Sequence, residues 1–363
     1  MRVRSGGEDN KPRILYLMNV DWAWIAQRPH FLAIELGKHY DVTVVYLKHY
    51  IKRWKSQTSV VQTNKSRNGL YLPLQDKIPV FQAISDASFI RAMGNLDDFD
   101  IIWIGSPLYF HFIKDFKCKI IYDCMDNNAE FADSEERRQE IIVMEDALIK
   151  RADHVICSSS YLCDAIEKRG GAGKISLVRN GFISKGIHEV STPANNSVHK
   201  LGYIGTVSSW MDFEALKLAL EAHDDIEIHM IGPAPEQTGK SLHERLIFDG
   251  TVEHDKLFDY IKDYDCLIMP FVINDVIEAV DPIKLYEYIS FGKCILSVYY
   301  KEIERFSDLV HFYQDSADFV TKVGELKTAG FPVQFSDEQQ KAFLGDNSWE
   351  IRGDLVGEII EKL

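Results

Sequence analysis

Short apolar runs of strand length alternate with helical patterns along the whole chain. Because parallel strands need a crossover connection, this alternation is typical of a parallel sheet covered by helices on both faces. In the first half we predict strands at Arg13–Met18, Val42–Tyr46, Ile101–Ile104, Lys119–Tyr122, His154–Ser158 and Ser176–Val178. Helices are predicted between them at Arg28–Lys38, Val80–Met93, Ser134–Arg151 and Ser160–Lys168. The fold class is therefore α/β.

A second series begins after Ser184–Val198, a polar stretch without periodicity that we interpret as a linker. Its strands are predicted at Lys200–Ile204, Ile226–Ile231, Leu246–Phe248, Cys266–Met269 and Cys294–Ser297. Its helices are predicted at Asp212–His223, Asp255–Lys262, Ile283–Ser290, Ser316–Leu326 and Ser348–Leu363. A chain of 363 residues exceeds the usual size of one hydrophobic core. The order of elements therefore predicts two Rossmann-like domains facing each other across a cleft, residues 1–195 and residues 196–345.

The charge is distributed unevenly along the chain. The net charge is −14, which argues against general nucleic-acid binding, and residues 1–195 carry +2 whereas residues 196–363 carry −16. Bases and aromatics concentrate in residues 48–55, Lys-His-Tyr-Ile-Lys-Arg-Trp-Lys, which would suit an anionic membrane surface or form an ordinary solvated loop. No apolar run approaches the roughly 20 residues of a membrane span, and the polar start is not a signal peptide. We therefore expect a cytoplasmic protein.

The run from Asp281 to Lys293 follows an apolar strand and opens a helix with Pro282 in its first turn. Free N–H groups at such a helix start favour a phosphate. Lys284 lies in the first turn, where a cation opposes the helix dipole unless an anion binds beside it. Glu287 lies one turn further on the same face. The pair suits the diphosphate and sugar hydroxyls of a nucleotide-sugar, although a solvated Lys–Glu pair on an amphipathic helix would show the same spacing.

Small residues follow two strands of the second series. Gly205 and Thr206 end the first of them, and Gly232 ends the next, so backbone N–H groups could approach phosphate there. Pro270 ends a third strand and could shape a base and ribose pocket. Simple strand-terminating turns would give the same residues.

The run Pro282-x-Lys-x-x-Glu-Tyr-x-x-x-Gly-Lys resembles the donor-site helix of GT-B glycosyltransferases, particularly bacterial enzymes that build surface polysaccharides. The resemblance implies that Lys284 meets the donor diphosphate and Glu287 the ribose. It also implies metal-independent transfer without a cofactor, and a closing helix, residues 346–363, that packs on the first domain. Two departures matter: the loop after Gly205 lacks the Arg and Lys of related enzymes, and Glu278 stands nine residues before Glu287 instead of eight. Asp281 could replace the missing first carboxylate.

Candidate catalytic residues lie in the first half. The strand ending at Tyr122 runs into an acidic turn with Asp123 and Asp126, and a carboxylate there could deprotonate an acceptor hydroxyl or simply form the turn. The turn resembles a Tyr-Asp-x-x-Asp run of the same enzymes. We take Asp126 as the candidate base and Asp123 as the second choice. His30, in a segment resembling Trp-x-x-Gln-Arg-Pro-x-x-Leu, is a secondary catalytic candidate, whereas the alternative is that this segment starts a helix over core tryptophans.

Two Asp-x-Asp triplets, residues 98–100 and 263–265, both precede strands, so we interpret them as turns and expect no metal site. No Gly-x-Gly-x-x-Gly follows a strand, which disfavours a dinucleotide-dependent dehydrogenase.

The resemblance, together with the order of elements, therefore implies a GT-B glycosyltransferase that uses a nucleotide-diphosphate sugar and a saccharide or lipid-linked acceptor. It also implies a role in bacterial surface polysaccharide biosynthesis, at the inner face of the cell membrane. A nucleotide-sugar epimerase of the same architecture, or a non-catalytic sugar-nucleotide-binding partner of an assembly complex, remain the alternatives.

Overall fold

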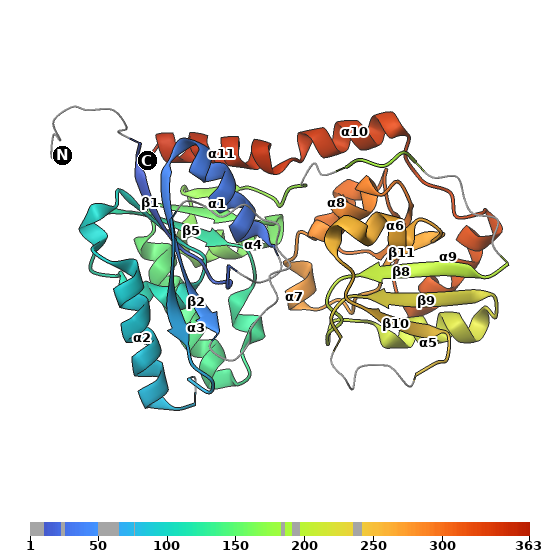
Figure 1. Cartoon of the computed structure of the whole chain (residues 1–363), viewed down its shortest axis with the longest axis horizontal. Helices are drawn as coiled ribbons and strands as arrows, with labels where there is room; N and C mark the ends of the chain where they lie inside the picture. The colour runs from blue at the N-terminus through green and yellow to red at the C-terminus, as the bar shows by residue number, and fades with distance from the viewer. Residues whose placement is uncertain are drawn as a thin grey trace. The chain divides into compact units, whose positions relative to one another are not determined.

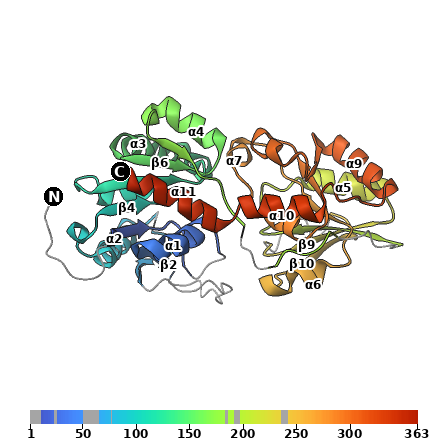
Figure 2. The same ribbon diagram turned by 90° about the horizontal axis from the view of Figure 1, so that it is seen from above.

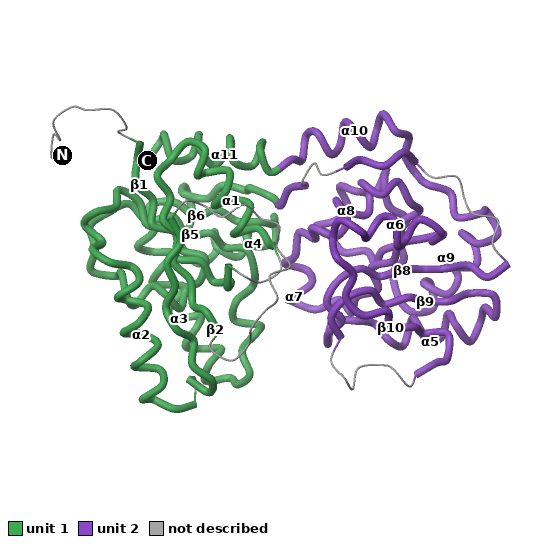
Figure 3. The backbone as a smooth tube through the Cα atoms, in the orientation of Figure 1, with its two compact units in different colours: residues 1–179, 349–363 green, residues 180–348 purple. Residues whose placement is uncertain are grey.

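A computed structural model describes residues 11–22, 26–49, 65–75, 77–182, 186–190, 197–234 and 242–363. The chain forms two compact units: residues 1–179 with residues 349–363 make unit 1, and residues 180–348 make unit 2 (Figure 3). The chain thus leaves unit 1 after residue 179 and returns to it at residue 349, whereas the sequence analysis places these boundaries after residues 195 and 345.

Unit 1 is built on a seven-stranded sheet in the order β3-β2-β1-β4-β5-β6-β7, and every pair of neighbouring strands is parallel. Strands β1, β2 and β5 of this sheet are labelled in Figure 1. The strands are β1 Arg13–Leu17, β2 Asp41–His49, β3 Ser66–Tyr71, β4 Ile101–Ile104, β5 Lys119–Cys124, β6 His154–Cys157 and β7 Ile175–Leu177. The helices are α1 Arg28–His39, α2 Pro79–Met93, α3 Glu135–Arg151, α4 Ser160–Ile166 and α11 Trp349–Glu361. Strand β4 is fully buried, as expected for a central strand covered on both faces.

The closing helix α11 packs against α1 in unit 1 (Figure 2). The rings of Phe31 and Trp349 stack with their centroids 5.0 Å apart. A Cβ atom at Gly353 would lie 2.6 Å from the Cβ of Glu35, so a glycine there lets the two helices approach closely. The predicted return of the C-terminal helix to the first domain is confirmed.

Unit 2 is built on a six-stranded parallel sheet in the order β10-β9-β8-β11-β12-β13. The strands are β8 His199–Ile204, β9 Ile226–Ile231, β10 Leu246–Gly250, β11 Cys266–Met269, β12 Cys294–Val298 and β13 His311–Tyr313. The helices are α5 Phe213–Ala222, α6 Leu257–Ile261, α7 Asp275–Glu278, α8 Ile283–Ser290, α9 Ser316–Thr328 and α10 Asp337–Asp346. Both sheets have the strand order of a doubly wound fold, in which ligands bind beyond the carboxyl ends of the strands where the order reverses.

Residues 186–190, which with residues 197–198 are the described parts of the predicted linker, pack within unit 2. The backbone N–H of His188 donates to Ser290 O at 2.9 Å, and that of Val190 donates to Asp337 Oδ1 at 2.7 Å. The His188 ring also stacks on Phe258. Residues 50–55 of the basic-aromatic segment and Trp24 lie outside the described residues. Within the described residues, no helix combines the length and hydropathy that crossing a bilayer requires.

Candidate functional site

The strand order of unit 2 reverses at β8, whose neighbours are β9 on one side and β11 on the other. The carboxyl end of β8 carries Gly205 and Thr206, and that of β9 carries Gly232. Gly205 N donates to Ile231 O at 2.8 Å, and Val207 N donates to Pro233 O at 2.9 Å, so the two turns lie side by side. The structure therefore brings these predicted residues together at the edge where ligands bind in such sheets.

Glycine is required at both turns. Gly205 and Gly232 each have φ near +143°, a conformation open mainly to glycine. A Cβ atom at Gly232 would overlap the carbonyl group of Gly205. At both positions the backbone conformation and the close packing of the two turns therefore require glycine. Because glycine has no side chain, another group can approach the peptide groups of these turns closely.

Lys284, in the first turn of α8, extends over Gly205. A Cβ atom at Gly205 would overlap Cε of Lys284 and would lie 3.0 Å from its Nζ. The ammonium group lies 5.8 Å from the centroid of the Tyr203 ring. Within the described part of the chain, no carboxylate lies within ion-pair distance of Lys284, and Thr206 offers a hydroxyl and an N–H without a described hydrogen-bond acceptor. An unpaired cation beside a glycine turn and a helix N-terminus forms an arrangement suited to a phosphate group.

Buried tyrosines fix this arrangement. Tyr288 accepts a hydrogen bond from Ile204 N at 2.8 Å, which ties α8 to the end of β8. Tyr203 donates to Thr206 O at 2.9 Å and so holds the turn that follows the same strand. Sequence reasoning missed both tyrosines, although the Tyr following Glu287 belongs to the motif. Their role is to hold Gly205 and Lys284 in register.

Glu287 has a partner that the sequence analysis did not identify. Its Oε1 lies 3.1 Å from Nε2 of His254, and its side chain stays 28% exposed. The carboxylate is thus oriented by an imidazole and still reachable by a ligand hydroxyl. No sequence signal links these two residues, which lie 33 positions apart.

Pro270 is buried at the carboxyl end of β11. Its carbonyl accepts a hydrogen bond from Asp212 N at 2.9 Å, and Val272 N donates to Trp210 O at 2.8 Å. These bonds attach the segment after Thr206 to the segment after β11. Pro270 therefore contributes to the site through its backbone carbonyl, which fixes the position of the neighbouring segment.

Asp281 does not serve as a replacement for the missing carboxylate, because it is fully engaged within the protein. It is 2% exposed, forms an ion pair with Arg305 at 2.5 Å, and accepts hydrogen bonds from Asn180 N at 2.6 Å and from the Tyr286 hydroxyl at 3.1 Å. Its carbonyl also accepts from the Asn180 amide at 2.6 Å. Asp281 instead anchors the start of α8 to the residue at which the chain enters unit 2.

In unit 1, Asp126 lies in the turn after β5. It is half-buried, and within the described residues no group hydrogen-bonds to its carboxylate. Burial, supported by repulsion from Asp123 and opposed by Arg28, raises the pKa of Asp126 to about 6. A carboxyl group with that pKa accepts a proton readily near neutral pH, as a general base must.

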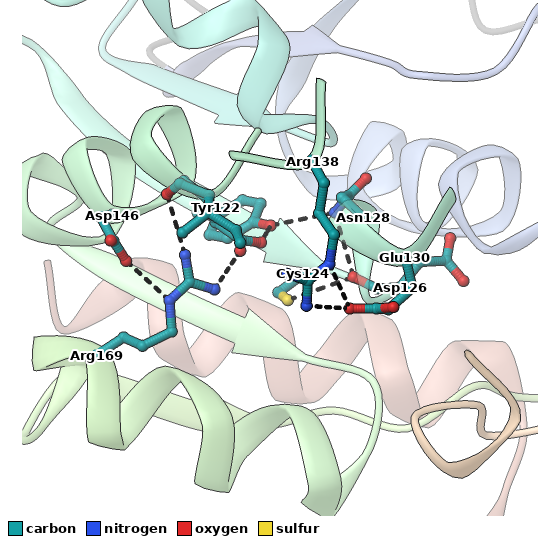
Figure 4. A network of polar contacts seen from close by, with 10 residues as sticks. Tyr122, Cys124, Asp126, Asn128, Glu130, Arg138, Asp146 and Arg169 are labelled. Carbon is teal, nitrogen blue, oxygen red and sulfur yellow. Dashed lines mark hydrogen bonds and ion pairs between the residues drawn. The ribbon is translucent and has the colours of Figure 1, made fainter. Parts of the chain in front are cut away.

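A chain of hydrogen bonds holds this turn in place (Figure 4). The Asn128 amide donates to Asp126 O at 3.2 Å and to the Tyr122 hydroxyl at 3.4 Å. Tyr122 in turn donates to Oε1 of Glu145 at 2.5 Å, and Glu145 pairs with Arg169. The turn that carries Asp126 is therefore attached to helix α3.

Asp123 is completely buried and paired with Arg28, whose Nε lies 3.0 Å and whose second guanidinium nitrogen lies 2.9 Å from Oδ1. Arg28 also donates to Val178 O at 2.6 Å, and Tyr16 donates to Asp123 Oδ2 at 3.4 Å. Neither side chain reaches solvent. Of the two candidate carboxylates, Asp126 is therefore the one without an ion-pair partner among the described residues, and Arg28 neutralises Asp123 inside unit 1.

His30 is fully buried in the first turn of α1. Its Nδ1 accepts from Gln27 N at 3.1 Å and its Nε2 lies 3.3 Å from Trp22 O, so both ring nitrogens are occupied. Burial lowers the pKa of His30 to about 4, which keeps the ring neutral. The buried Trp22 packs against the same ring, and these contacts describe a helix cap without access to a substrate.

The Asp-x-Asp triplets lie at the opposite ends of the strands. Asp100 accepts from Arg13 N at 2.8 Å before β4, and Asp265 accepts from Lys200 N at 2.9 Å before β11. Among the described residues, no group of three or more His, Cys, Asp or Glu side chains is placed to hold a metal ion. Both aspartates close the amino ends of neighbouring parallel strands, as the sequence analysis predicts for turns.

No family model matches the chain. It is 29% identical over 197 residues to the "Putative teichuronic acid biosynthesis glycosyltransferase TuaH" of Bacillus subtilis (strain 168), over 49% of this chain and 50% of that protein. The chain thus aligns with about half the length of this curated relative.

Solved structures match nearly the whole chain. Sucrose-phosphate synthase from Thermosynechococcus elongatus superposes with a TM-score of 0.72 at 12% identity, covering 97% of this chain and 99% of that one. HepE from Anabaena, in complex with UDP-glucose, gives 0.70 at 15% identity over 97% and 100%. The lipopolysaccharide outer core galactosyltransferase WaaB gives 0.66 at 14% identity, also over 97% and 100%. The predicted GT-B fold, with two Rossmann-like domains, is confirmed.

Proposed function

We propose that this protein is a glycosyltransferase that moves a sugar from a nucleotide-diphosphate donor to a saccharide or lipid-linked saccharide. The observation that carries the proposal is the position of the Lys284 ammonium, unpaired among described residues, over Gly205 at the carboxyl end of β8. Similarity to TuaH over half the chain and the shared fold with HepE, solved with UDP-glucose, support the same assignment.

Unit 2 would hold the donor. Lys284 and the N–H groups of the first turn of α8 would neutralise the charge that develops on the diphosphate as the glycosidic bond to the anomeric carbon breaks. Glu287, oriented by His254, would accept hydrogen bonds from the ribose hydroxyls. Pro270 and Gly232 would line the adjoining pocket. A lysine and a helix terminus would supply positive charge beside the diphosphate, so the proposed transfer uses no metal ion.

Unit 1 would bind the acceptor, and Asp126 would act as the base. Its carboxylate would take the proton of the attacking hydroxyl as the new bond forms between acceptor oxygen and anomeric carbon, and the nucleoside diphosphate would leave. The pKa of about 6 keeps most of this carboxyl ionised at neutral pH. Neither Asp123 nor His30 offers a comparable free group, since each is buried with its polar atoms engaged.

We further propose a role in bacterial surface polysaccharide biosynthesis at the inner face of the cell membrane. The TuaH similarity supports this class of product, and the basic-aromatic composition of residues 48–55 supports contact with anionic lipid.

A panel of nucleotide sugars in a thermal-shift assay tests the donor assignment, followed by incubation of the stabilising donor with bacterial membranes. The proposal predicts stabilisation by one class of diphosphate sugar and transfer of its sugar to a membrane-extractable product. Conversion of the donor without an acceptor would indicate an epimerase. Binding without transfer, hydrolysis or conversion would indicate a non-catalytic partner, and no stabilisation by any donor would contradict both the binding site and the reaction.

A further inference from the structure

The outward face of helix α2 in unit 1 is apolar. Val80, Ile84 and Ile90 are 60%, 46% and 51% exposed, and Ala83 and Ala87 are exposed between them. The spacing of these five residues places them along one side of a helix. We call this set, Val80, Ala83, Ile84, Ala87 and Ile90, the α2 stripe.

The rotation of α2 is set by contacts on its other side. Ser88 Oγ accepts from Leu70 N at 2.7 Å, and Ser85 Oγ accepts from Leu72 N at 3.3 Å. The Cβ that Gly69 lacks would lie 2.8 Å from Cα of Phe89, so β3 and α2 touch backbone to backbone. Ser85 therefore faces the sheet side together with the buried Phe89 and Met93, whereas the outward side carries valine and isoleucine where an ordinary surface helix carries polar residues. In Figures 1 and 2, α2 lies at the outer border of unit 1.

Helix α3 of the same unit shows the ordinary pattern. Its exposed positions are mostly polar or charged, among them Glu136, Gln139, Glu140 and Asp146. Val143, 65% exposed, is a single aliphatic residue among them. Isolated residues of this kind are common on protein surfaces, whereas a continuous row on one helix marks a contact surface.

Leu74 extends the apolar surface ahead of the helix. It is 59% exposed with φ +58°, an uncommon conformation for a bulky residue. The N–H groups of Lys77 and Ile78 both donate to its carbonyl at 2.9 Å, so the turn that displays Leu74 leads directly into α2. The exposed Leu74 side chain makes few contacts that could offset the strain of its backbone within the protein. A contact with a binding partner would offset that strain.

The surrounding charge indicates which partner fits. Within the part of residues 41–94 that the structure describes, five residues are Lys or Arg and two are Asp, although the whole chain carries −14. Lys77 and Arg91 are exposed near the two ends of the stripe. Asp86, the acidic residue of α2, accepts a hydrogen bond from Gln82 at 2.7 Å. An aliphatic row bordered by cations matches a bilayer with anionic headgroups, because the side chains enter the acyl boundary while the bases meet the phosphates.

We propose that the α2 stripe, together with Leu74, is a membrane-docking surface that inserts into the interface of an anionic phospholipid bilayer. The inference rests on the proposed membrane location but not on sugar transfer. A single short stripe predicts weak, reversible attachment that strengthens with anionic lipid content.

Sedimentation of the full chain with vesicles tests the proposal. The vesicles contain phosphatidylcholine alone, or an equal mixture of phosphatidylcholine and phosphatidylglycerol. We expect binding to the mixed vesicles and a loss of about tenfold or more in Val80→Glu and Ile84→Glu, since each removes an inserting side chain and adds a charge. Val143→Glu is the matched control: it adds the same charge to an exposed helix position of unit 1 and should leave binding within about twofold of wild type.

Circular dichroism and the thermal shift caused by the donor verify that each variant is folded and that unit 2 is intact. Absence of vesicle binding by the wild-type protein would overturn the membrane location together with the docking surface. Binding that Val80→Glu and Ile84→Glu leave unchanged would overturn the docking surface alone. A wild-type dimer that Ile84→Glu dissociates, measured by analytical ultracentrifugation, would assign the stripe to self-association and overturn the proposal. None of these outcomes depends on whether sugar transfer is observed.

Discussion

Lys284 crosses Gly205 so closely that any side chain at position 205 would overlap its Cε atom. The two residues are far apart in the sequence, and each belongs to an element that the fold fixes independently: Gly205 ends β8, and Lys284 opens α8. Tyr288 joins these elements through its hydrogen bond from Ile204 N. The position of the ammonium group thus depends on a glycine as much as on the lysine itself.

Replacement of Gly205 by alanine should therefore displace Lys284. We expect the affinity for the donor to fall about tenfold or more, with an additional loss of stability of about 1–3 kcal/mol from the backbone conformation. Isothermal titration calorimetry and urea denaturation measure the two effects. Gly330→Ala is the control, because Gly330 also has positive φ and a Cβ there meets nothing within 4 Å. Equal donor affinity in both variants would argue against the role of this contact.

Asp126→Asn should abolish most of the transfer rate, by about 10²–10⁴-fold, if Asp126 is the base. With a pKa of about 6, the wild-type rate should rise as pH increases through 6, because the ionised carboxylate is the active form. Asn at this position should remove that rise. A pH profile of kcat that keeps its inflection in the variant would contradict the assignment.

The same substitution should raise stability at neutral pH. The folded pKa of Asp126 lies above the ordinary value of 3.8, so the folded protein binds this proton more tightly than the unfolded chain, and the group lowers stability progressively as pH rises from about 4 through 6. Asp126→Asn should then gain about 1–3 kcal/mol at pH 8 and little at pH 4. Thermal melts at the two pH values measure it, and an equal effect at both would contradict the environment described for this carboxyl group.

Asp123→Asn should behave differently. It would leave the buried Arg28 without its anionic partner, and breaking a buried ion pair costs about 3–5 kcal/mol. We expect a lower urea midpoint with an unchanged pH inflection in whatever activity remains. A variant with normal stability and no activity would restore Asp123 as the base.

Arg305→Met should show how much the hydrogen-bonded network around Asp281 contributes to the stability of unit 2. The substitution removes the ion pair that holds Asp281 beside Asn180 and Tyr286, and we expect a loss of about 3 kcal/mol or more in unfolding free energy. Lys301→Met is the control, since the exposed Lys301 pairs only at the surface with Glu304. Comparable stability of the two variants would indicate that the Asp281 network contributes little.

The central strands and their connections could be predicted from the sequence because they are continuous apolar runs. Strand β3, Ser66–Tyr71, was missed, since an edge strand with Ser, Arg and Asn lacks that signal. Helix α10, Asp337–Asp346, was missed because it buries only Gln340 and Leu344. The central strands are specified by a local hydrophobic pattern that the sequence shows. Strand β3 and helix α10 instead depend on packing at the surface of their units, which the sequence does not show.

The residues proposed for the donor side could be selected from the sequence because glycine turns and a helix start are local features, and the structure places Gly205, Gly232 and Lys284 close together. The partners of Asp123, Asp281 and Glu287 could not, since Arg28, Arg305 and His254 lie 95, 24 and 33 positions away. Sequence alone therefore identified carboxylates without showing which are already neutralised. Asp123 is completely buried and paired with Arg28, whereas Asp126 is half-buried and has no such partner among the described residues. No local sequence pattern predicts this difference.

The most direct measurement compares wild type and Lys284→Ala in their affinity for UDP and for uridine, or for the corresponding pair if the thermal-shift panel selects another base. If Lys284 binds the diphosphate, the variant should lose about 10–100-fold for the nucleoside diphosphate and nothing for the nucleoside, because a charge-assisted hydrogen bond contributes about 1.5–3 kcal/mol. Lys322→Ala, an exposed lysine paired with Glu325, should bind both ligands as wild type does. An equal loss for both ligands, or none for either, would contradict the account.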